Sequence, residues 1–326
     1  MDTKNSSEKR GGVAFLFGFE RSGTTLLSMM VGAHPRIAVP LSATGLWYRY
    51  GKMLERYNGL VSSGDLERIV DDLLHEERIG LWDEHFTRDE VLMGLEPGSY
   101  PAVIARFQSL YAQRKGKDLW GNIDIGTLDD MDMANRWFPD ARFVHIVRDG
   151  RDVALSHKTY VYGTANIWEC ANRWASKVQT NLKMGAMLDP RRYMVLRYED
   201  LVLEPEANLR RLCSFMEVDY SPQMLEYTDM VHEKVSPERK ALLWPLLDKP
   251  PTAQQVYRWK REMSRSERMV FERAAQPVLT ALGYEAYATL PSTLRANALE
   301  LWCFLGQGGR FERLARKIGI RGERAA

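Results

Sequence analysis

The hydrophobic positions near the start of the chain form a short apolar run followed by a helical pattern. The run from Val13 to Phe17 predicts a buried strand. Residues 18–23 interrupt it with a glycine at each end, and from Thr24 the apolar residues return at helical spacing. The apolar positions of this predicted helix are Leu26, Leu27, Met29, Met30 and Ala33. The chain therefore opens with a strand, a glycine-bounded loop and a helix.

The same alternation continues along the chain. Apolar runs at 119–126, 142–147 and 193–198 predict further strands, and 34–47, with two prolines, predicts a loop or extended chain. Helices are predicted in much of 46–115 and at 131–138, 148–160, 166–188, 203–218 and within 257–284, with a proline-rich linker at 244–252. Strands that alternate with helices predict an α/β fold, a P-loop-like central parallel sheet flanked by helices, whose ligands lie beyond the carboxyl ends of the strands.

Four segments follow from this pattern. Residues 1–12 are predicted to be a disordered lead, and 13–290 to form one domain. Within it, the largely helical stretch 46–115 interrupts the alternation, and we expect it to wall the side where an acceptor binds. Residues 291–326 are predicted to be a helical extension docked on the domain. The alternative is a helix that contacts a membrane surface or a partner, because its second half is basic and mildly amphipathic.

The composition, net charge and cysteine spacing of the chain argue against several classes of protein. The chain has 326 residues, 45% of them hydrophobic and 27% charged, with a net charge of +2. A near-neutral balance gives no reason to expect nucleic acid. The three cysteines (Cys170, Cys213, Cys303) are far apart and form neither a disulfide framework nor a zinc spacing, which favours the cytoplasm. No signal peptide or membrane-spanning run is recognised.

The loop between the first strand and helix has the spacing of a phosphate-binding loop, Gly18-x4-Gly23. A helix N-terminus there leaves backbone N–H groups without partners and carries about half a positive charge, so it attracts an anion. The residue after Gly23 is Thr24, however, where nucleotide triphosphatases carry a lysine. The only cation of the loop is Arg21. The loop is therefore expected to bind an anion other than a triphosphate.

A second strand end carries similar chemistry. Arg148 follows the strand at 142–147, and Ser156 comes eight residues later on the next predicted helix. An arginine and a hydroxyl in that arrangement can grip one phosphate. The alternative is a surface ion pair between Arg148 and Asp149 with a solvated Ser156. Taken together with the first loop, Arg148 and Ser156 predict a nucleotide that is phosphorylated at both its 5′ and 3′ positions.

These motifs resemble a known family. The stretch FLFGFERSGTTLLSMMVGAHP resembles the 5′-phosphosulfate loop of sulfotransferases that use PAPS (3′-phosphoadenosine 5′-phosphosulfate). FPDARFVHIVRDGRDVALS is similar to their 3′-phosphate motif, VLRYEDLVLEPEANLRRLCSFMEV to the segment that follows, and YRWKREMS to their C-terminal cofactor loop. The likeness covers about 13–284 in the expected order. The Arg-Ser-Gly-Thr-Thr form is closer to bacterial, tyrosylprotein and carbohydrate sulfotransferases than to the phenol type, which has lysine there.

The resemblance implies a role for each motif residue. Arg21 and the helix N-terminus would hold the charge that develops on the leaving 5′-phosphate. The remaining residues implied in binding PAPS and its product PAP are Ser22, Gly23, Thr24 and Thr25 at the 5′ end, Arg148, Ser156, Arg258 and Lys260 at the 3′-phosphate, and Tyr198 at the adenine. PAPS has no triphosphate chain to neutralise, so no metal is expected. For Trp259 the sequence leaves two interpretations, a residue of the hydrophobic core or a contact with the ligand.

The general base is where this chain departs from its relatives. Where tyrosylprotein-type enzymes carry a glutamate, this chain has Ser42. Where the family's common Gly-Asp-Lys-Thr-Pro segment has its lysine, this chain has Ile123. Asp124 lies in the segment where cytosolic relatives carry a catalytic histidine, so it is the first candidate for the general base. The alternative is that Asp124 only stabilises a turn or caps a helix. Further candidates are Glu20, His85 and His157. His34 and His145 are predicted to be structural.

The resemblance and the residues predict sulfuryl transfer from PAPS to a hydroxyl, or to an amine. The acceptor is expected to be a small molecule, a carbohydrate or a lipid. Two alternatives stay open. The departures at Ser42 and Ile123 would suit a PAP-binding protein that has lost catalysis. A small-molecule kinase on the same scaffold would need Mg²⁺ and ATP, against which the missing lysine speaks.

Overall fold

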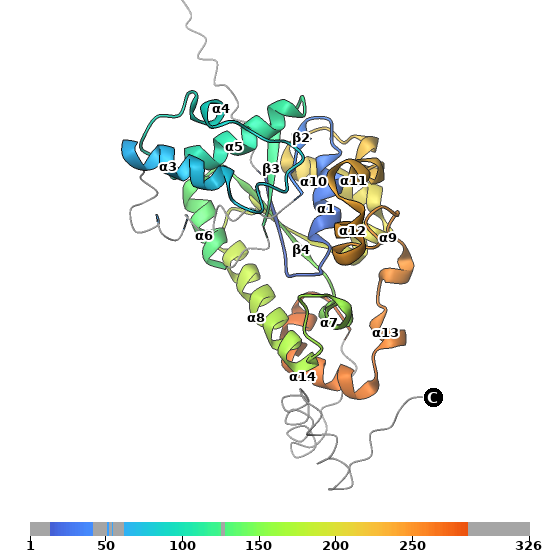
Figure 1. The fold of residues 1–326 in the computed structure, drawn as a ribbon. Helices are drawn as coiled ribbons and strands as arrows, with labels where there is room; N and C mark the ends of the chain where they lie inside the picture. Colours follow the sequence, from blue (N-terminus) through green and yellow to red (C-terminus); the bar gives the residue numbers. More distant parts are fainter. Residues whose placement is uncertain (1–13, 42–50, 52–53, 55–61, 125–127, 286–326) are drawn as a thin grey trace, which may run out of the picture. The chain divides into compact units, whose positions relative to one another are not determined.

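The computed structural model describes residues 14–41, 51, 54, 62–124 and 128–285 (Figure 1). The predicted lead (1–12), the predicted extension (291–326), Cys303 and Ser42 lie outside the described residues. The predicted domain limits at 13 and 290 do so as well, and they stay a prediction.

The centre of the fold is a five-stranded parallel sheet in the order β2-β3-β1-β4-β5. Its strands are β1 (Ala14–Phe17), β2 (Ile37–Ala38), β3 (Leu119–Asp124), β4 (Arg142–Val147) and β5 (Tyr193–Arg197). β1 is buried along its whole length, as its continuous apolar run requires of a strand covered on both faces. The predicted fold class, a central parallel sheet flanked by helices, is confirmed.

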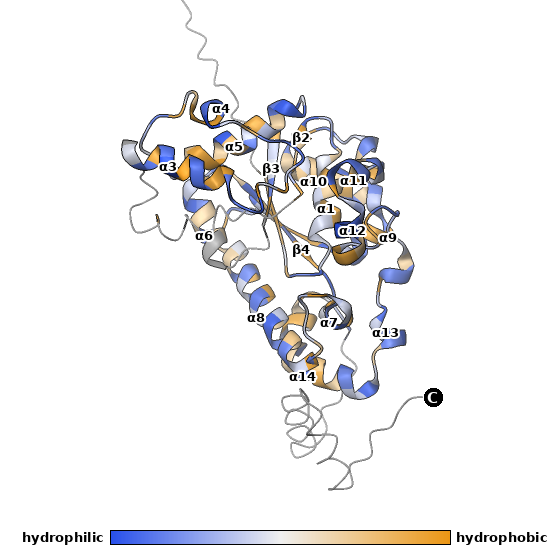
Figure 2. Ribbon diagram, in the orientation of Figure 1, coloured by the Kyte–Doolittle hydropathy of each residue, from blue (hydrophilic) through white to orange (hydrophobic). Residues whose placement is uncertain are grey.

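The helices of the described residues follow the strands in alternation. They are α1 (Thr24–Gly32), α3 (Ser63–Leu74), α4 (Arg88–Leu92), α5 (Tyr100–Arg114), α6 (Leu128–Trp137), α7 (Gly150–Thr159), α8 (Ile167–Ala186), α9 (Tyr198–Leu203), α10 (Pro205–Met216), α11 (Thr228–Lys234), α12 (Pro237–Leu243), α13 (Trp259–Glu262) and α14 (Arg265–Ala281), with 3₁₀ turns at Pro222–Leu225 and Ala253–Gln255. Figure 2 shows polar and apolar residues alternating along α8, the pattern of a helix with one buried face.

Three elements differ from the sequence expectations. β2 is a two-residue edge strand between Pro35 and Pro40 where only loop or extended chain was expected. An edge strand tolerates prolines because one row of its N–H groups makes no ladder bonds. The helix expected at 203–218 is present as α10, which Pro205 opens at a position where its missing N–H costs nothing. A further short helix, α9, lies directly after β5 and was not expected. α12 was not expected at all.

The described chain divides into two compact units. The first comprises residues up to 148 and 180–253, and the second comprises 149–179 and the residues from 254 on. In the first unit α1 and α9 to α12 lie on one side of the sheet and α3 to α6 on the other (Figure 1). An apolar cluster in this unit joins Phe15, Phe17 and Phe143 of the sheet to α3, α5 and α6. In the second unit Trp174 packs on Phe271, with ring centroids 5.8 Å apart.

No helix among the described residues is both long enough and apolar enough to cross a membrane.

Candidate active site

The loop between β1 and α1 has the close contacts that its two glycines predict. A Cβ on Gly18 would lie 2.4 Å from the carbonyl oxygen of Ile146 in the neighbouring strand. Gly23 has a φ of +97°, and a Cβ there would lie 2.5 Å from the ring of Tyr198. A side chain at either position would therefore displace the loop from the sheet edge. The predicted strand, glycine-bounded loop and helix are confirmed.

The start of α1 has the features of an anion site. Gly23 is its N-cap and supplies no side chain to cap the helix. Ser22 is fully buried, and its Oγ has no hydrogen-bond partner among the described residues. Buried polar atoms are normally paired, so an oxygen or nitrogen of a ligand is the natural partner for this hydroxyl. Together with the helix dipole, the donors of this loop fit a phosphate or sulfate group.

Arg21 is held in an unusual backbone conformation. Its φ is 65°, a left-handed value that non-glycine residues rarely adopt and that persists only where surrounding contacts hold it. Its Nη1 donates to the carbonyl oxygen of Leu243 at 2.9 Å, at the end of α12. The contact between Arg21 and α12 could not be anticipated, because the two are 222 residues apart.

Arg148 lies against the same loop. It follows β4, is only 7% exposed, and its Nη1 donates to the carbonyl oxygen of Arg21 at 3.3 Å. Its Cζ lies 4.4 Å from the ring centroid of Tyr198, within the range of a cation–π contact. Tyr198, the first residue of α9, thus touches both Gly23 and Arg148. The sequence suggested Tyr198 only as an adenine contact, because ring stacking across elements leaves no signal in a pattern.

The alternative of a surface ion pair between Arg148 and Asp149 does not fit the structure. Asp149 is fully buried, and its carboxylate accepts hydrogen bonds from Arg151 at 2.8 and 2.9 Å. Ser156 lies on α7 in the second unit and is half-buried.

The predicted cofactor-loop cations, Arg258 and Lys260, also belong to the second unit. They flank Trp259, which is 1% exposed and is therefore a core residue. Arg258 forms an ion pair with Glu262 at 2.6 Å, and Lys260 one with Glu285 at 3.1 Å. Both side chains are partly exposed, so the two cations face solvent while the tryptophan between them anchors the segment.

Among the candidates for a general base, Asp124 has the most informative place in the sheet. It ends β3, and its Cα pairs with that of Phe17, the residue before Gly18. Carboxyl ends of adjacent parallel strands meet at one edge, so Asp124 ends beside the loop. Ile123 is 3% exposed and pairs with Leu16, so the residue in place of a lysine is part of the core.

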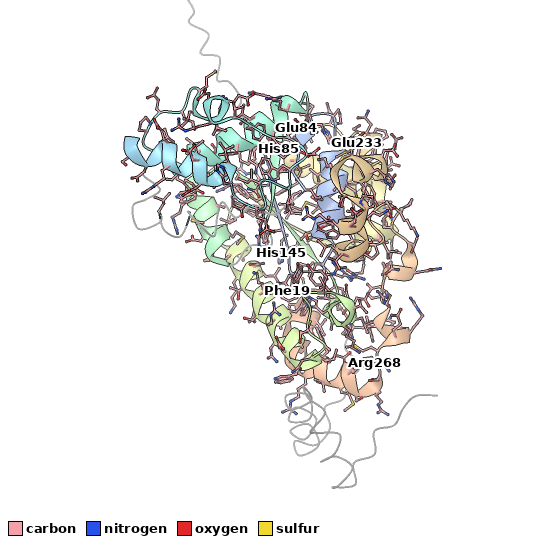
Figure 3. All side chains as sticks on the ribbon, viewed as in Figure 1. Phe19, Glu84, His85, His145, Glu233 and Arg268 are labelled. Atoms are coloured by element: carbon pink, nitrogen blue, oxygen red, sulfur yellow. The ribbon has the colours of Figure 1, made fainter. Side chains whose placement is uncertain are left out.

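The other candidates are distributed differently. Glu20 is half-buried in the loop itself. His85 is exposed and lies among α3 to α5, away from His145 in the sheet (Figure 3). His157 is buried on α7 in the second unit. The loop therefore lies close to Asp124 and Glu20, and the structure does not bring His85 to it.

The two histidines expected to be structural are buried. His34 Nε2 lies 2.8 Å from the carbonyl oxygen of Asp219, and its Nδ1 accepts from the backbone N–H of Arg36. His145 stacks on Phe17 with ring centroids 4.9 Å apart, and its Nδ1 lies 2.8 Å from the hydroxyl of Tyr193. Burial lowers the pKa of His145 to about 3, so it is neutral at physiological pH. Neither side chain is placed to exchange protons with solvent.

No group of three or more histidine, cysteine, aspartate or glutamate side chains is placed to hold a metal ion in the described part of the chain.

A family model described as "Sulfotransferase family" matches residues 14–222, which include the loop, Asp124, Arg148, Ser156 and Tyr198. The chain belongs to the sulfotransferase family. It is therefore a transferase, its reaction is sulfuryl transfer, and its sulfuryl donor is PAPS.

Similar sulfotransferases are found in animals. The protein-tyrosine sulfotransferase A of Caenorhabditis elegans is 21% identical over 85% of this chain and 68% of its own length. The protein-tyrosine sulfotransferase 1 of Homo sapiens is 24% identical over 85% of this chain and 71% of its own.

Two solved structures share the fold of this sulfotransferase. The sulfotransferase domain of the Synechococcus PCC 7002 olefin synthase superposes with a TM-score of 0.57 and 18% identity, covering 87% of this chain and 99% of that one. The sulfotransferase domain of the curacin biosynthetic pathway gives a TM-score of 0.55 and 20% identity, covering 85% and 99%.

Proposed function

We propose that this sulfotransferase binds PAPS at the carboxyl ends of β1 and β4 and transfers the sulfuryl group to a hydroxyl by in-line displacement. An amine acceptor is the alternative. The observation that carries the proposal is the contact of Arg148 and Tyr198 with the loop at Gly18–Gly23. It places a cation next to the start of α1, whose N–H groups and Ser22 hydroxyl suit an anionic ligand.

At the 5′ end of PAPS, the loop would stabilise the leaving group. The bond between sulfur and the 5′-phosphate oxygen breaks while a bond between sulfur and the acceptor oxygen forms, so negative charge builds up on the phosphate of PAP. We assign Arg21, Ser22, Gly23, Thr24 and Thr25 to that charge. Donors aimed at a developing charge contribute about 3 kcal/mol each to the transition state. Such a reaction depends on positioning and electrostatics more than on covalent help.

At the 3′-phosphate we assign Arg148 and Ser156, together with Arg258 and Lys260, and at the adenine Tyr198. Support comes from the chemistry of the residues, from the resemblance of their motifs and, for Arg148 and Tyr198, from their contacts with the loop. Arginine suits a phosphate because its planar fork can donate two parallel hydrogen bonds.

The acceptor proton would pass to Asp124. This proposal rests on the place of Asp124 at the end of β3, beside the loop. We expect Asp124→Asn to bind PAP like the wild type and to lower turnover by about 100-fold or more, since an amide cannot take the proton. Asp118→Asn, which changes an exposed aspartate just before β3, is the matched control and should keep full turnover. Normal turnover by Asp124→Asn would assign the base elsewhere, with Glu20 next in line.

The class of acceptor follows from a direct assay. The relatives are protein-tyrosine sulfotransferases by name, so a tyrosine peptide belongs in the panel with sugars and lipid alcohols. Protein incubated with ³⁵S-labelled PAPS should label one of these classes. Binding of PAP without labelling of any acceptor would favour the alternative, a PAP-binding protein that has lost catalysis.

For the compartment we propose the cytoplasm. The support is the sequence spacing of Cys170, Cys213 and Cys303, which suits neither a disulfide framework nor a zinc site.

A further inference from the structure

The segment that carries Arg258 and Lys260 has little intrinsic stability. Its helix, α13, is one turn long, from Trp259 to Glu262. The residue just before Arg258, Tyr257, has a φ of 52°, a left-handed value that costs energy in a non-glycine residue. Such a conformation persists only where surrounding contacts hold it. The segment therefore needs support from outside itself.

The support comes from the first turn of α7. The backbone N–H of Trp259 donates to Oδ1 of Asp152 at 2.8 Å, and both residues are buried. This hydrogen bond lies between residues 107 positions apart in the chain. It fixes the backbone midway between Arg258 and Lys260. A bond from a buried N–H to a carboxylate is about twice as strong as a neutral one.

A second contact fixes the side chain of the same tryptophan. The Cζ of Arg151 lies 3.6 Å from the Trp259 ring centroid. Arg151 is itself fixed by two buried carboxylates, since it donates to Asp149 at 2.8 and 2.9 Å and to Glu272 at 2.6 Å. Because the charge is paired on both sides, the guanidinium can remain buried and serve as a rigid platform for the ring.

We propose that Asp152 is a positioning residue that presents Arg258 and Lys260 to the 3′-phosphate of the nucleotide. The inference rests on the proposed function, because it takes these two cations as ligands of that phosphate. Asp152 itself does not touch the ligand in this proposal. Its effect is to keep the backbone of Trp259 in place, so the enzyme distinguishes a nucleotide with a 3′-phosphate from one without it.

The test compares two ligands and three variants. Affinities for PAP and for adenosine 5′-monophosphate, which lacks the 3′-phosphate, are measured by calorimetry. We expect Asp152→Ala to bind PAP about tenfold more weakly, the loss typical of a charged hydrogen bond, while its affinity for the monophosphate changes less than twofold. Asp152→Asn keeps an acceptor oxygen and should stay within threefold of the wild type for both ligands. Lys158→Met removes an α7–α14 ion pair outside this network and should leave both affinities unchanged.

An equal loss of affinity for both ligands in Asp152→Ala, or no loss for either, would overturn the inference. A wild type that does not prefer PAP to the monophosphate would overturn the proposed function and this inference with it. Hydrogen–deuterium exchange of the wild type needs no variant to fold. The amides of 258–262 should be protected before PAP is added, and protection that arises only with PAP would also overturn the inference.

Discussion

At the scale of the residue, the loop at Gly18–Gly23 lies against the sheet edge and contacts residues from distant parts of the chain. Gly18 and Gly23 could be assigned from their spacing, because each position requires a residue without a side chain. The partners of that loop could not. Tyr198 packs on Gly23 and under Arg148, and Leu243 accepts a hydrogen bond from Arg21. These contacts join residues far apart in the chain, and no local periodicity encodes them.

Arg148 provides the first prediction at this scale. Arg148→Ala should lower the affinity for PAP by about 100-fold or more, because it removes a charged, bidentate phosphate donor beside the loop. Arg36→Ala is the matched control, since Arg36 forms an exposed ion pair with Asp118 that contributes little. Calorimetric titration with PAP measures both. Equal affinities for the two variants would remove Arg148 from the binding site.

His145 provides the second prediction at the scale of the residue. Its pKa is about 3 in the folded protein, below the ordinary value of 6.5, because the ring is buried. Between pH 6.5 and 3 the unfolded chain therefore binds a proton that the folded chain does not. The free energy of unfolding should fall as pH falls through this window, by about 1.4 kcal/mol per pH unit from this group. Denaturant titrations of His145→Phe should show a shallower acid slope than the wild type, and an unchanged slope would contradict the assignment.

At the scale of the element, strands were predicted more closely than helices. β4 begins and ends at the predicted residues, because an apolar run bounded by charged residues has clear limits. β2 was missed because two residues cannot show a period. α9 was missed because its first residue, Tyr198, continues the apolar pattern of β5. A boundary between two buried elements leaves no change in hydropathy to detect.

α5 and α11 are joined by a polar contact that carries a further prediction. Lys234 of α11 donates to the hydroxyl of Tyr111 at 2.8 Å, and that hydroxyl donates to Asp83 at 2.7 Å. Burial lowers the pKa of Lys234 to about 8, so the ammonium depends on these partners.

Tyr111→Phe should therefore lower the free energy of unfolding by about 1 to 3 kcal/mol, because it leaves Lys234 and Asp83 without the hydroxyl between them. Tyr162→Phe, at a tyrosine that is 71% exposed, is the control and should change stability by less than about 0.5 kcal/mol. Denaturant unfolding measures both. Equal stability of the two variants would show that the contact is energetically neutral.

At the scale of the whole molecule, nucleotide preference separates this sulfotransferase from a kinase. A ligand that binds only the folded chain stabilises it by about 2.7 kcal/mol at 100 times its dissociation constant. PAP should therefore raise the midpoint of thermal unfolding by roughly 5 °C. ATP with Mg²⁺ should raise it much less, since the loop lacks the lysine that follows Gly23 in triphosphate-binding proteins. A larger shift with ATP than with PAP would contradict the assigned donor.

The network around Arg151 also has a consequence for synthesis on the ribosome. Arg151 and its partner Glu272 are 121 residues apart, and Asp152 and Trp259 are 107 apart. While the nascent chain emerges, the strands of the sheet can pair long before those later partners exist. During that interval Arg151 has Asp149 beside it but neither Glu272 nor the indole ring. The second unit can close around this arginine only after α14, which carries Glu272, has been translated, so this closure must follow the pairing of the sheet.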